Sequence, residues 1–469
     1  MSSTVILGSG IIGLSIAHYL ADHQPGSTIH FVEPSPELFA SASGYAGGFL
    51  ARDWFSAKSA SLGALSFDEH KRLAEENHGK EKWGWSTSTT YSHAAAPIKK
   101  SRNGERWLSE GGSRADVVEA VETHGDGPSW LRRAAGDDVQ VIGDSEATGQ
   151  VEPLRLCNFL LETCKSEGVH LHHPATALSI NTDLRGELST VCIGDTSSST
   201  ETDVPCTRLV IAAGAWSPRV FTQLFPGASI ELPISSLAGH SLVIKPSGDD
   251  TTQAGCHAIF STDGAGFSPE LFSRVGGHIY IAGVNAPELP LPDLPGQTPI
   301  SPAAIDQLQQ TAGRIIHVPE GDLEVVRKGL CFRPVTASGE PILARIPDSR
   351  LGDGISTRPG AEGGVFLAAG HGPWGISLSL GTGKCTSAIV GRDGVQQSQL
   401  SEPLPAPNDL RVSNVRNAWR GCDGLWAAPS RSIEFVLCRD GFPANVPESS
   451  TTGCAQDPPA SLCPVVHLD

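Results

Sequence analysis

Basic side chains are scarce in this sequence. It has 34 Lys and Arg against 51 Asp and Glu, which gives a formal net charge of −17 at pH 7. A surface of that sign repels polyanions and argues against nucleic acid or an anionic membrane as a main partner. Charged residues make up 18% of the chain and hydrophobic residues 39%, as in ordinary globular proteins. For 469 residues we expect two domains plus additions.

The sequence also lacks an uninterrupted apolar run and paired cysteines. Glycines break its most apolar stretch, residues 5–20, and no basic region precedes it, so we expect neither a membrane span nor a cleaved signal. The 11 cysteines show no CxxC spacing. We therefore expect reduced thiols in an intracellular, cytoplasmic protein and no metal site.

A glycine-rich turn follows the first apolar strand, residues 5–7. The sequence GSGIIG begins at Gly8, which permits the tight turn; Gly10 lets a pyrophosphate approach, and Gly13 lets helix and strand pack closely. A helix over about 11–22, starting with Ile11 and Ile12, then directs free N–H groups at the phosphates. We predict a dinucleotide-binding unit.

Glu33 completes this unit. It ends a second strand over 29–32, twenty residues after Gly13, where a carboxylate can accept hydrogen bonds from a ribose diol. Glu33 would repel a 2′-phosphate, which disfavours NADP. The fingerprint by itself leaves FAD and NAD open.

Later segments indicate how the rest of the chain is organised. Alternating apolar runs over 237–284, separated by Gly, Asp and Pro, predict an antiparallel sheet. Residues 329–343 and 365–383 return to apolar strand, glycine turn and helix. We interpret the charged clusters between about 65 and 130 as solvated surface. The fold class predicted is α/β, a doubly wound Rossmann-like domain with a second, antiparallel-sheet (α+β) domain.

Five segments in chain order resemble the D-amino-acid oxidase superfamily, in particular its glycine and sarcosine oxidase branch. They are SASGYAGGFLA at 41–51, GQVEP at 149–153, VIAAGAWSP at 210–218, GLCFRPVTASGEPIL at 329–343 and AAGHGPWGISLSLGTG at 368–383. FSPELFSRVGGHIYIAG at 267–283 is most similar to fungal members, some linked to endosomal recycling. An endosome association is implied by this resemblance alone.

The resemblance implies an FAD cofactor and residues that surround it. Small residues would pass close to the flavin, a second segment would close over the dinucleotide, and a third would direct N–H groups at the pyrimidine end of the ring. These groups are, in turn, Ser43, Gly44, Ala46, Gly47 and Gly48; Gly214, Ala215 and Trp216; and Gly372, Trp374, Gly375, Ile376 and Ser377. The implied FAD-binding domain comprises 1–76, 142–232 and 327–392, the substrate domain 77–141 and 233–326, and a loosely ordered tail 393–469.

The same resemblance implies oxidation of an amine or amino acid. Arg333, in CFRPV, would pair with a substrate carboxylate, and Tyr280 and Trp374 are the other candidate catalytic residues. Hydride would pass from the Cα–H to the flavin, and the imine would hydrolyse. Cys331 occupies the place where sarcosine oxidases bond covalently to the flavin; a covalent link and an inert buried thiol both remain open.

One departure from the family leaves the electron acceptor open. Sarcosine oxidases place a lysine that promotes the oxygen reaction on the strand resembling 278–284, and no lysine occurs there. Either O2 is used with another cation, such as Arg274 or His240, or another acceptor takes the electrons. We expect His371 to be a packing residue rather than a base. The alternatives are an amine dehydrogenase, a flavoprotein acting as an interaction module, and an NAD-dependent dehydrogenase.

Overall fold

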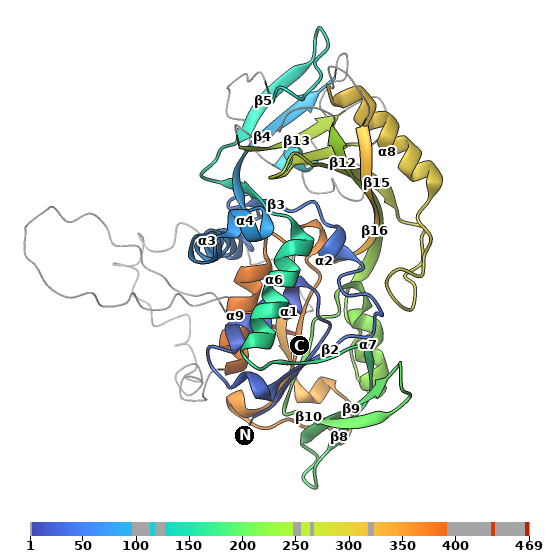
Figure 1. Cartoon of the computed structure of the whole chain (residues 1–469). Coiled ribbons are helices and arrows are strands. Elements are labelled where there is room, and N and C mark those ends of the chain that lie inside the picture. The colour runs from blue at the N-terminus through green and yellow to red at the C-terminus, as the bar shows by residue number, and fades with distance from the viewer. Residues whose placement is uncertain are drawn as a thin grey trace, which may run out of the picture.

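The computed structural model describes residues 2–95, 113–117, 127–246, 255–262, 267–317, 323–391, 433–436 and 465–468. Two large sheets dominate it (Figure 1). The expected loose tail, 393–469, lies outside the described residues apart from two short strands.

The first sheet is built around a parallel, doubly wound core. Its order is β19-β20-β17-β18-β11-β1-β2-β7, and β1 pairs in parallel with both β2 and β11. The strands, in that order, are Ile433–Val436, Val465–Leu468, Ile342–Ile346, Gly364–Ala369, Arg208–Ile211, Thr4–Leu7, Ile29–Val32 and His170–His172. The chain winds outward from β1 in both directions, so the carboxyl ends of β1 and β11 form a topological switch point where ligands bind. This confirms the predicted Rossmann-like domain.

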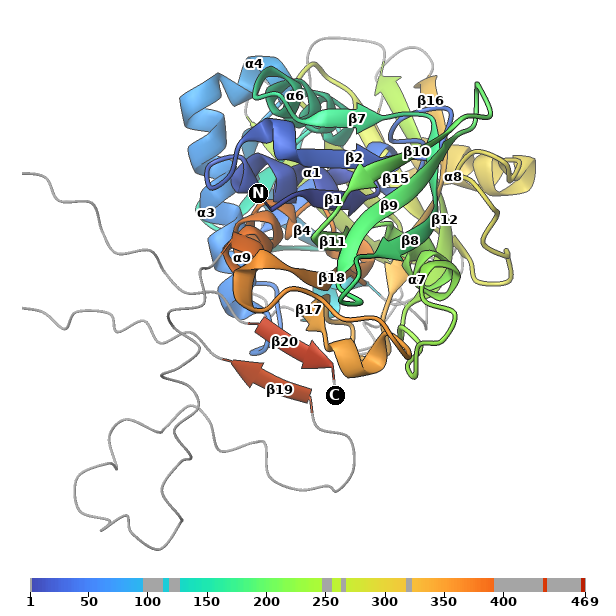
Figure 2. The same cartoon turned by 90° about the horizontal axis from the view of Figure 1, so that it is seen from below.

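Alternate residues of β1 point to opposite faces of this sheet. Ile6 joins the core formed with α1 (Ile11–Leu20), α6 (Pro153–Ser166) and α9 (Ser379–Gly391). Val5 and Leu7 join the core on the other face. That face carries α7 (Ser217–Leu224) and an antiparallel three-stranded sheet that the sequence analysis did not predict, with β8 at Ala175–Thr182, β9 at Leu188–Asp195 and β10 at Glu201–Pro205. Figure 2 shows these layers from below.

The second sheet runs in the order β16-β12-β15-β14-β13-β4-β6-β3, with β5 beside β4. The strands are Leu323–Val335, Ser235–Pro246, Ile279–Ala286, Glu270–Ser273, Cys256–Thr262, Ser86–Ala94, Thr148–Gln150, Phe49–Ala51 and, for β5, Asp138–Gly143. Antiparallel pairing dominates, as predicted, but β13 and β4 pair in parallel. β3 and β6, which the expected boundaries assign to the first domain, pair within this sheet.

One face of the second sheet packs on a helix and the other faces the first domain. Ile279 and Ile281 lie in a core with Ile305 and Leu308 of α8 (Pro302–Ile315), whereas Tyr280 belongs to the core shared with α1. Because successive side chains of a strand point to opposite faces of the sheet, one face of β15 packs on α8 and the other borders the first domain. The other α-helices of the described residues are α2 (Ala42–Tyr45), α3 (Ala60–Asn77) and α4 (Gly79–Trp83).

None of the helices in the described parts of the chain has the length and apolar character of a membrane span. Free thiols are found at Cys157, Cys164, Cys192, Cys206, Cys256 and Cys331, as expected. Cys385 departs from that expectation, because it is disulfide-bonded.

Candidate active site

The turn after β1 is so tight that it requires glycine. Gly8 has φ +102°, and a Cβ there would lie 2.7 Å from the carbonyl oxygen of Ala212, the residue that follows the neighbouring strand β11. A Cβ on Gly13 would lie 2.2 Å from the carbonyl oxygen of Gly8. The turn therefore presents backbone, without side chains, to whatever lies in front of the N-terminus of α1, as a pyrophosphate needs.

Glu33 is fixed at the end of β2 by the turn itself. Its Oε2 accepts hydrogen bonds from the backbone N of Ser9 at 3.0 Å and from the Ser9 hydroxyl at 3.1 Å. Its Oε1 accepts from the backbone N of Ser35 at 3.0 Å. An ionised carboxylate has about four acceptor sites, so Glu33 is held in place and can still accept from a ribose diol.

A single cavity of ≈ 290 Å³ joins this dinucleotide cradle to the second sheet. Most residues singled out in the sequence line it together. They are Gly8, Gly10, Ile11, Ile12, Glu33, Ser43, Ala46, Gly47, Gly48, Gly214, Ala215, Trp216, Tyr280, Cys331, Arg333, Gly372, Gly375 and Ile376. One continuous space can thus hold a dinucleotide and a small molecule beside it.

Four of the predicted residues stand behind the cavity wall. Gly13 and Gly44 allow close backbone packing, since a Cβ on Gly44 would lie 2.3 Å from the carbonyl oxygen of Phe39. The Ser377 hydroxyl accepts from the backbone N of Ala51 at 3.0 Å. Trp374 packs edge-on against Phe55, with ring centroids 4.9 Å apart. These residues support the site without lining it.

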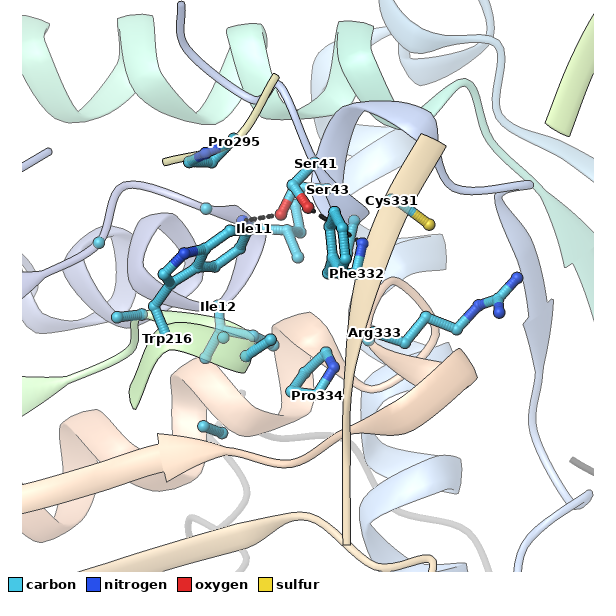
Figure 3. A pocket seen from close by; sticks show the side chains of 18 of the residues that line it. Ile11, Ile12, Ser41, Ser43, Trp216, Pro295, Cys331, Phe332, Arg333 and Pro334 are labelled. Carbon is cyan, nitrogen blue, oxygen red and sulfur yellow. Dashed lines mark hydrogen bonds between the residues drawn. The ribbon is translucent and has the colours of Figure 1, made fainter. Parts of the chain in front are cut away.

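Two serines connect the cradle to the second sheet. The Oγ of Ser43 accepts from the backbone N of Ile11 at 2.9 Å, at the start of α1, and the Oγ of Ser41 accepts from the backbone N of Phe332 at 3.3 Å. Figure 3 shows both contacts, which are made by a residue of α2 and by the residue before it. Ser41 was not among the residues predicted from the sequence, although it begins the segment SASGYAGGFLA.

Arg333 reaches across a neighbouring strand because that strand carries a glycine. Cys331 and Arg333 project from one side of β16 and Phe332 from the other (Figure 3). A Cβ on Gly239 of β12 would lie 2.5 Å from Nη1 of Arg333, so the guanidinium lies directly over Gly239. Its Nη1 donates to Oδ1 of Asn285 on β15 at 2.7 Å. This contact fixes the plane of the guanidinium and leaves N–H groups for a bidentate carboxylate.

Tyr280 and Phe272 form an aromatic wall of the cavity. Their rings stack at 5.8 Å and 3°. A Cβ on Gly47 would lie 2.6 Å from the Phe272 ring and 2.9 Å from Tyr280, so glycine is needed there. Burial, together with the nearby Cys331, raises the pKa of Tyr280 to about 12. Tyr280 is therefore a neutral phenol.

One polar segment predicted as solvated surface contributes a residue to the cavity wall. That prediction covered the charged clusters between about 65 and 130, yet Arg114 lies in the cavity wall with its side chain 8% exposed. Its Nη2 lies 3.0 Å from Oε2 of Glu270 on β14. Burial lowers the pKa of Arg114, and Glu270 acts in the opposite direction. The only sequence signal was an isolated acid beside apolar residues in ELFS.

Neither cation suggested as a substitute for the missing lysine lines the cavity. Arg274 donates from Nη2 to the carbonyl oxygens of Ala46 and Gly47, at 2.9 and 3.0 Å. His240 accepts from the backbone N of Ser301 at 3.3 Å. Both sit behind the wall, and no lysine is among the described residues that line the cavity.

His371 does line the cavity, at the turn before the short helix Gly372–Trp374. Its Nε2 lies 3.0 Å from the hydroxyl of Thr382 on α9. Burial lowers the pKa of His371 to about 3. His371 is thus a neutral imidazole.

Comparison with known proteins agrees with this site. The sequence model of a family described as FAD dependent oxidoreductase (DAO) matches residues 3–389. A Schizosaccharomyces pombe protein named as an oxidoreductase is 28% identical over 408 residues, which cover 82% of this chain and 93% of the relative. Glycine oxidase from Geobacillus kaustophilus superposes with a TM-score of 0.61 at 22% identity, covering 84% of this chain and 96% of the enzyme.

L-proline dehydrogenase from P. horikoshii also superposes, with a TM-score of 0.59 at 14% identity, covering 84% of this chain and 95% of the enzyme. At these identities the structural likeness shows a shared fold. The glycine cradle, the fixed Glu33 and the extended cavity fit FAD, the cofactor of the matched family. The chain belongs to the DAO family of FAD-dependent oxidoreductases.

Proposed function

We propose that this protein oxidises a small amine or amino acid that carries a carboxylate. Bound FAD supplies the acceptor for the hydride that leaves the substrate Cα, and water then hydrolyses the imine product. Electrons pass on to O2 with release of peroxide. The observation that carries the proposal is the single cavity that joins the Gly8–Glu33 cradle to Arg333.

The residues of the chain orient the substrate in this reaction. Arg333, fixed by Asn285, binds the carboxylate through two parallel hydrogen bonds. Tyr280 and Phe272 form an apolar wall that excludes water from the reacting carbon. A carboxylate held at one end and a flat wall beside it restrict how the Cα–H can point, and such restriction is a large part of rate enhancement.

The first test is an anaerobic titration of the purified holoprotein with glycine, sarcosine, proline and other small amines, followed by the visible flavin absorbance. Bleaching by one of them supports the proposal and identifies the substrate group. A yellow protein that none of them bleaches would favour a flavoprotein acting as an interaction module. Tight binding of NAD without flavin would overturn the proposal altogether.

The electron acceptor is tested separately. In the sarcosine oxidases that the sequence resembles, a lysine promotes the reaction with O2, and no lysine is among the described residues lining this cavity. A dehydrogenase that passes electrons to another carrier is therefore the second candidate. One peroxide released per amine oxidised supports the oxidase, whereas turnover that needs an added dye or quinone supports the dehydrogenase.

Cys331 lines the cavity two residues before Arg333 and is buried. Burial raises the pKa of the thiol, and the nearby Arg333 lowers it by less. The neutral thiol is the less nucleophilic form. Acid precipitation of the holoprotein decides whether Cys331 is a covalent flavin link or an inert buried thiol. Flavin that stays with the precipitated protein is covalently bound, and flavin that remains in the supernatant is not.

A further inference from the structure

Glu270 and Arg114 form an ion pair on the cavity wall, and the proposed contacts of Arg333, Tyr280 and Phe272 with the substrate do not use it. Their side chains are 14% and 8% exposed, and both line the cavity that contains Arg333. Removing two charges from water costs free energy that the attraction within an ion pair does not always offset. Charged groups buried in a cleft are candidates for ligand binding.

Within the described part of the chain, only one oxygen of the Glu270 carboxylate accepts a hydrogen bond. Oε2 of Glu270 accepts from Arg114 at 3.0 Å, while Oε1 has no hydrogen bond among the described residues. Arg114 is itself held by aromatic faces, with its guanidinium 4.5 Å from the Trp374 ring centroid and 5.8 Å from that of Phe260. Oε1 of Glu270 is therefore a fixed, negatively charged hydrogen-bond acceptor at the cavity wall, and such an acceptor suits a positively charged N–H group.

The strand register places this acceptor at a useful distance from Arg333. The guanidinium lies over Gly239 of β12. Two residues further along β12, Ser241 pairs with Ala282 of β15, and Ala282 in turn pairs with Glu270 of β14. Two residues along a strand and two strand spacings across the sheet separate the Gly239 and Glu270 backbones by about 12 Å. The Glu270 side chain shortens this gap toward the cavity. A molecule with a carboxylate and an ammonium on one carbon, each in a charged hydrogen bond of about 2.8 Å, is the kind of ligand that would bridge the two side chains.

We propose that Glu270 binds the substrate amine through Oε1 while Arg333 binds the carboxylate, so that the Cα is held between two opposite charges. Arg114 is a positioning residue that fixes Glu270 through Oε2. Tyr280 lies on β15, between β14 with Glu270 and β16 with Arg333 in the strand order, and lines the same cavity. The inference rests on the proposed function, because it assigns the second half of the same substrate.

The test separates binding from turnover. In the holoprotein, 2-aminoisobutyrate carries both charges but has no Cα–H and cannot be oxidised, and pivalate has a methyl group in place of its ammonium. Each is titrated against the flavin absorbance. We expect Glu270→Gln to raise the Kd of 2-aminoisobutyrate by about 10- to 100-fold, the range for losing a hydrogen bond between charged groups. The Kd of pivalate should change by less than about threefold, because its only expected charged contact is Arg333.

Three further variants complete the test. Arg333→Met should weaken the binding of both ligands. Glu288→Gln, a change on an exposed segment, should leave both affinities unchanged. Glu270→Asp keeps the charge and should still bind 2-aminoisobutyrate more tightly than pivalate. Equal weakening of both ligands in Glu270→Gln, or none in either, overturns the assignment while leaving the proposed function in place. If the wild-type flavin responds to neither ligand nor to any amine, the proposed function fails as well.

Discussion

At the scale of single residues, a glycine decides where Arg333 can lie. Gly239 faces the cavity side of β12, directly beneath the guanidinium. Any side chain there would meet the tip of Arg333 before it met backbone. The position of Arg333, the proposed carboxylate-binding group, therefore depends on a glycine that has no side chain.

Gly239→Ala should misplace Arg333 and leave the fold intact. The new Cβ would lie 2.5 Å from Nη1, and the flexible end of Arg333 would move away. We expect kcat/KM for carboxylated amines to fall about 10- to 100-fold, because misplacement by about 1 Å is that costly. The thermal unfolding midpoint should stay near the wild-type value. Gly313→Ala, where a Cβ meets nothing within 4 Å, is the control, and equal kinetics in the two variants would contradict the prediction.

Glu69 is the second residue with a marked individual effect, since it links three helices. Its carboxylate accepts from the Tyr19 hydroxyl at 2.7 Å and contacts Arg72 and Lys384 at 2.8 and 2.7 Å. Burial would raise its pKa, but hydrogen bonds from Arg72, Lys384 and Tyr19 outweigh burial and lower it to about 2.

The stability that Glu69 contributes should depend on pH. Its pKa in the folded state lies below the unfolded value of 4.5, so the unfolded chain takes up the proton first as the pH falls. The contribution is complete above about pH 5 and is lost toward pH 2. We expect Glu69→Gln to lower the free energy of unfolding by about 2 kcal/mol at pH 7 and by less at pH 3.5. Urea titrations at both pH values measure this, with Glu76→Gln, whose side chain is 53% exposed, as the control.

At the scale of elements, the connection between β15 and α8 crosses from the second sheet to the first domain. The Nε1 of Trp216 donates to the carbonyl oxygen of Pro292 at 2.8 Å. Arg219 donates to the same oxygen at 3.0 Å and to the carboxylate of Asp293 at 3.0 Å. Asp293, Leu294 and Pro295 line the cavity, so this connection covers the dinucleotide end (Figure 3).

Weakening this cover should speed the release of FAD. We expect Trp216→Phe and Arg219→Ala each to raise the FAD dissociation rate about fivefold, since each loses at least one hydrogen bond worth about 1 kcal/mol. The increase of flavin fluorescence after dilution measures the rate. Arg185→Ala, which removes an exposed ion pair on the β8–β9 hairpin, should release FAD at the wild-type rate. Unchanged rates in all three variants would show that the connection does not retain the cofactor.

At the scale of the whole molecule, the cavity lies where the two sheets meet. Residues of β1, α1 and β2 line one part of it and residues of β14, β15 and β16 another. A ligand that fills the cavity contacts both parts and binds only the folded chain. Occupancy must then stabilise the whole fold.

Removal of FAD should lower the thermal unfolding midpoint of the entire protein. At a free FAD concentration of 100 times Kd, the stabilisation is about 2.7 kcal/mol. Calorimetry of the stripped protein, the reconstituted protein and the stripped protein with NAD measures the effect. We expect FAD to restore the midpoint and NAD to leave it unchanged; restoration by NAD would contradict the assigned cofactor.

The amino-acid sequence by itself determined the dinucleotide unit, the family and most of the cavity lining. The strand, GSGIIG, the helix and Glu33 lie within about thirty residues, and their spacing follows from local backbone geometry. Tertiary structure alone decided the rest. Arg114 and Glu270 are 156 positions apart, and Arg333 and Asn285 are 48 apart. No local pattern specifies such pairs. Sheet pairing brings Arg333 of β16 to Asn285 of β15, and the packing of the segment that holds Arg114 against β14 brings Arg114 to Glu270.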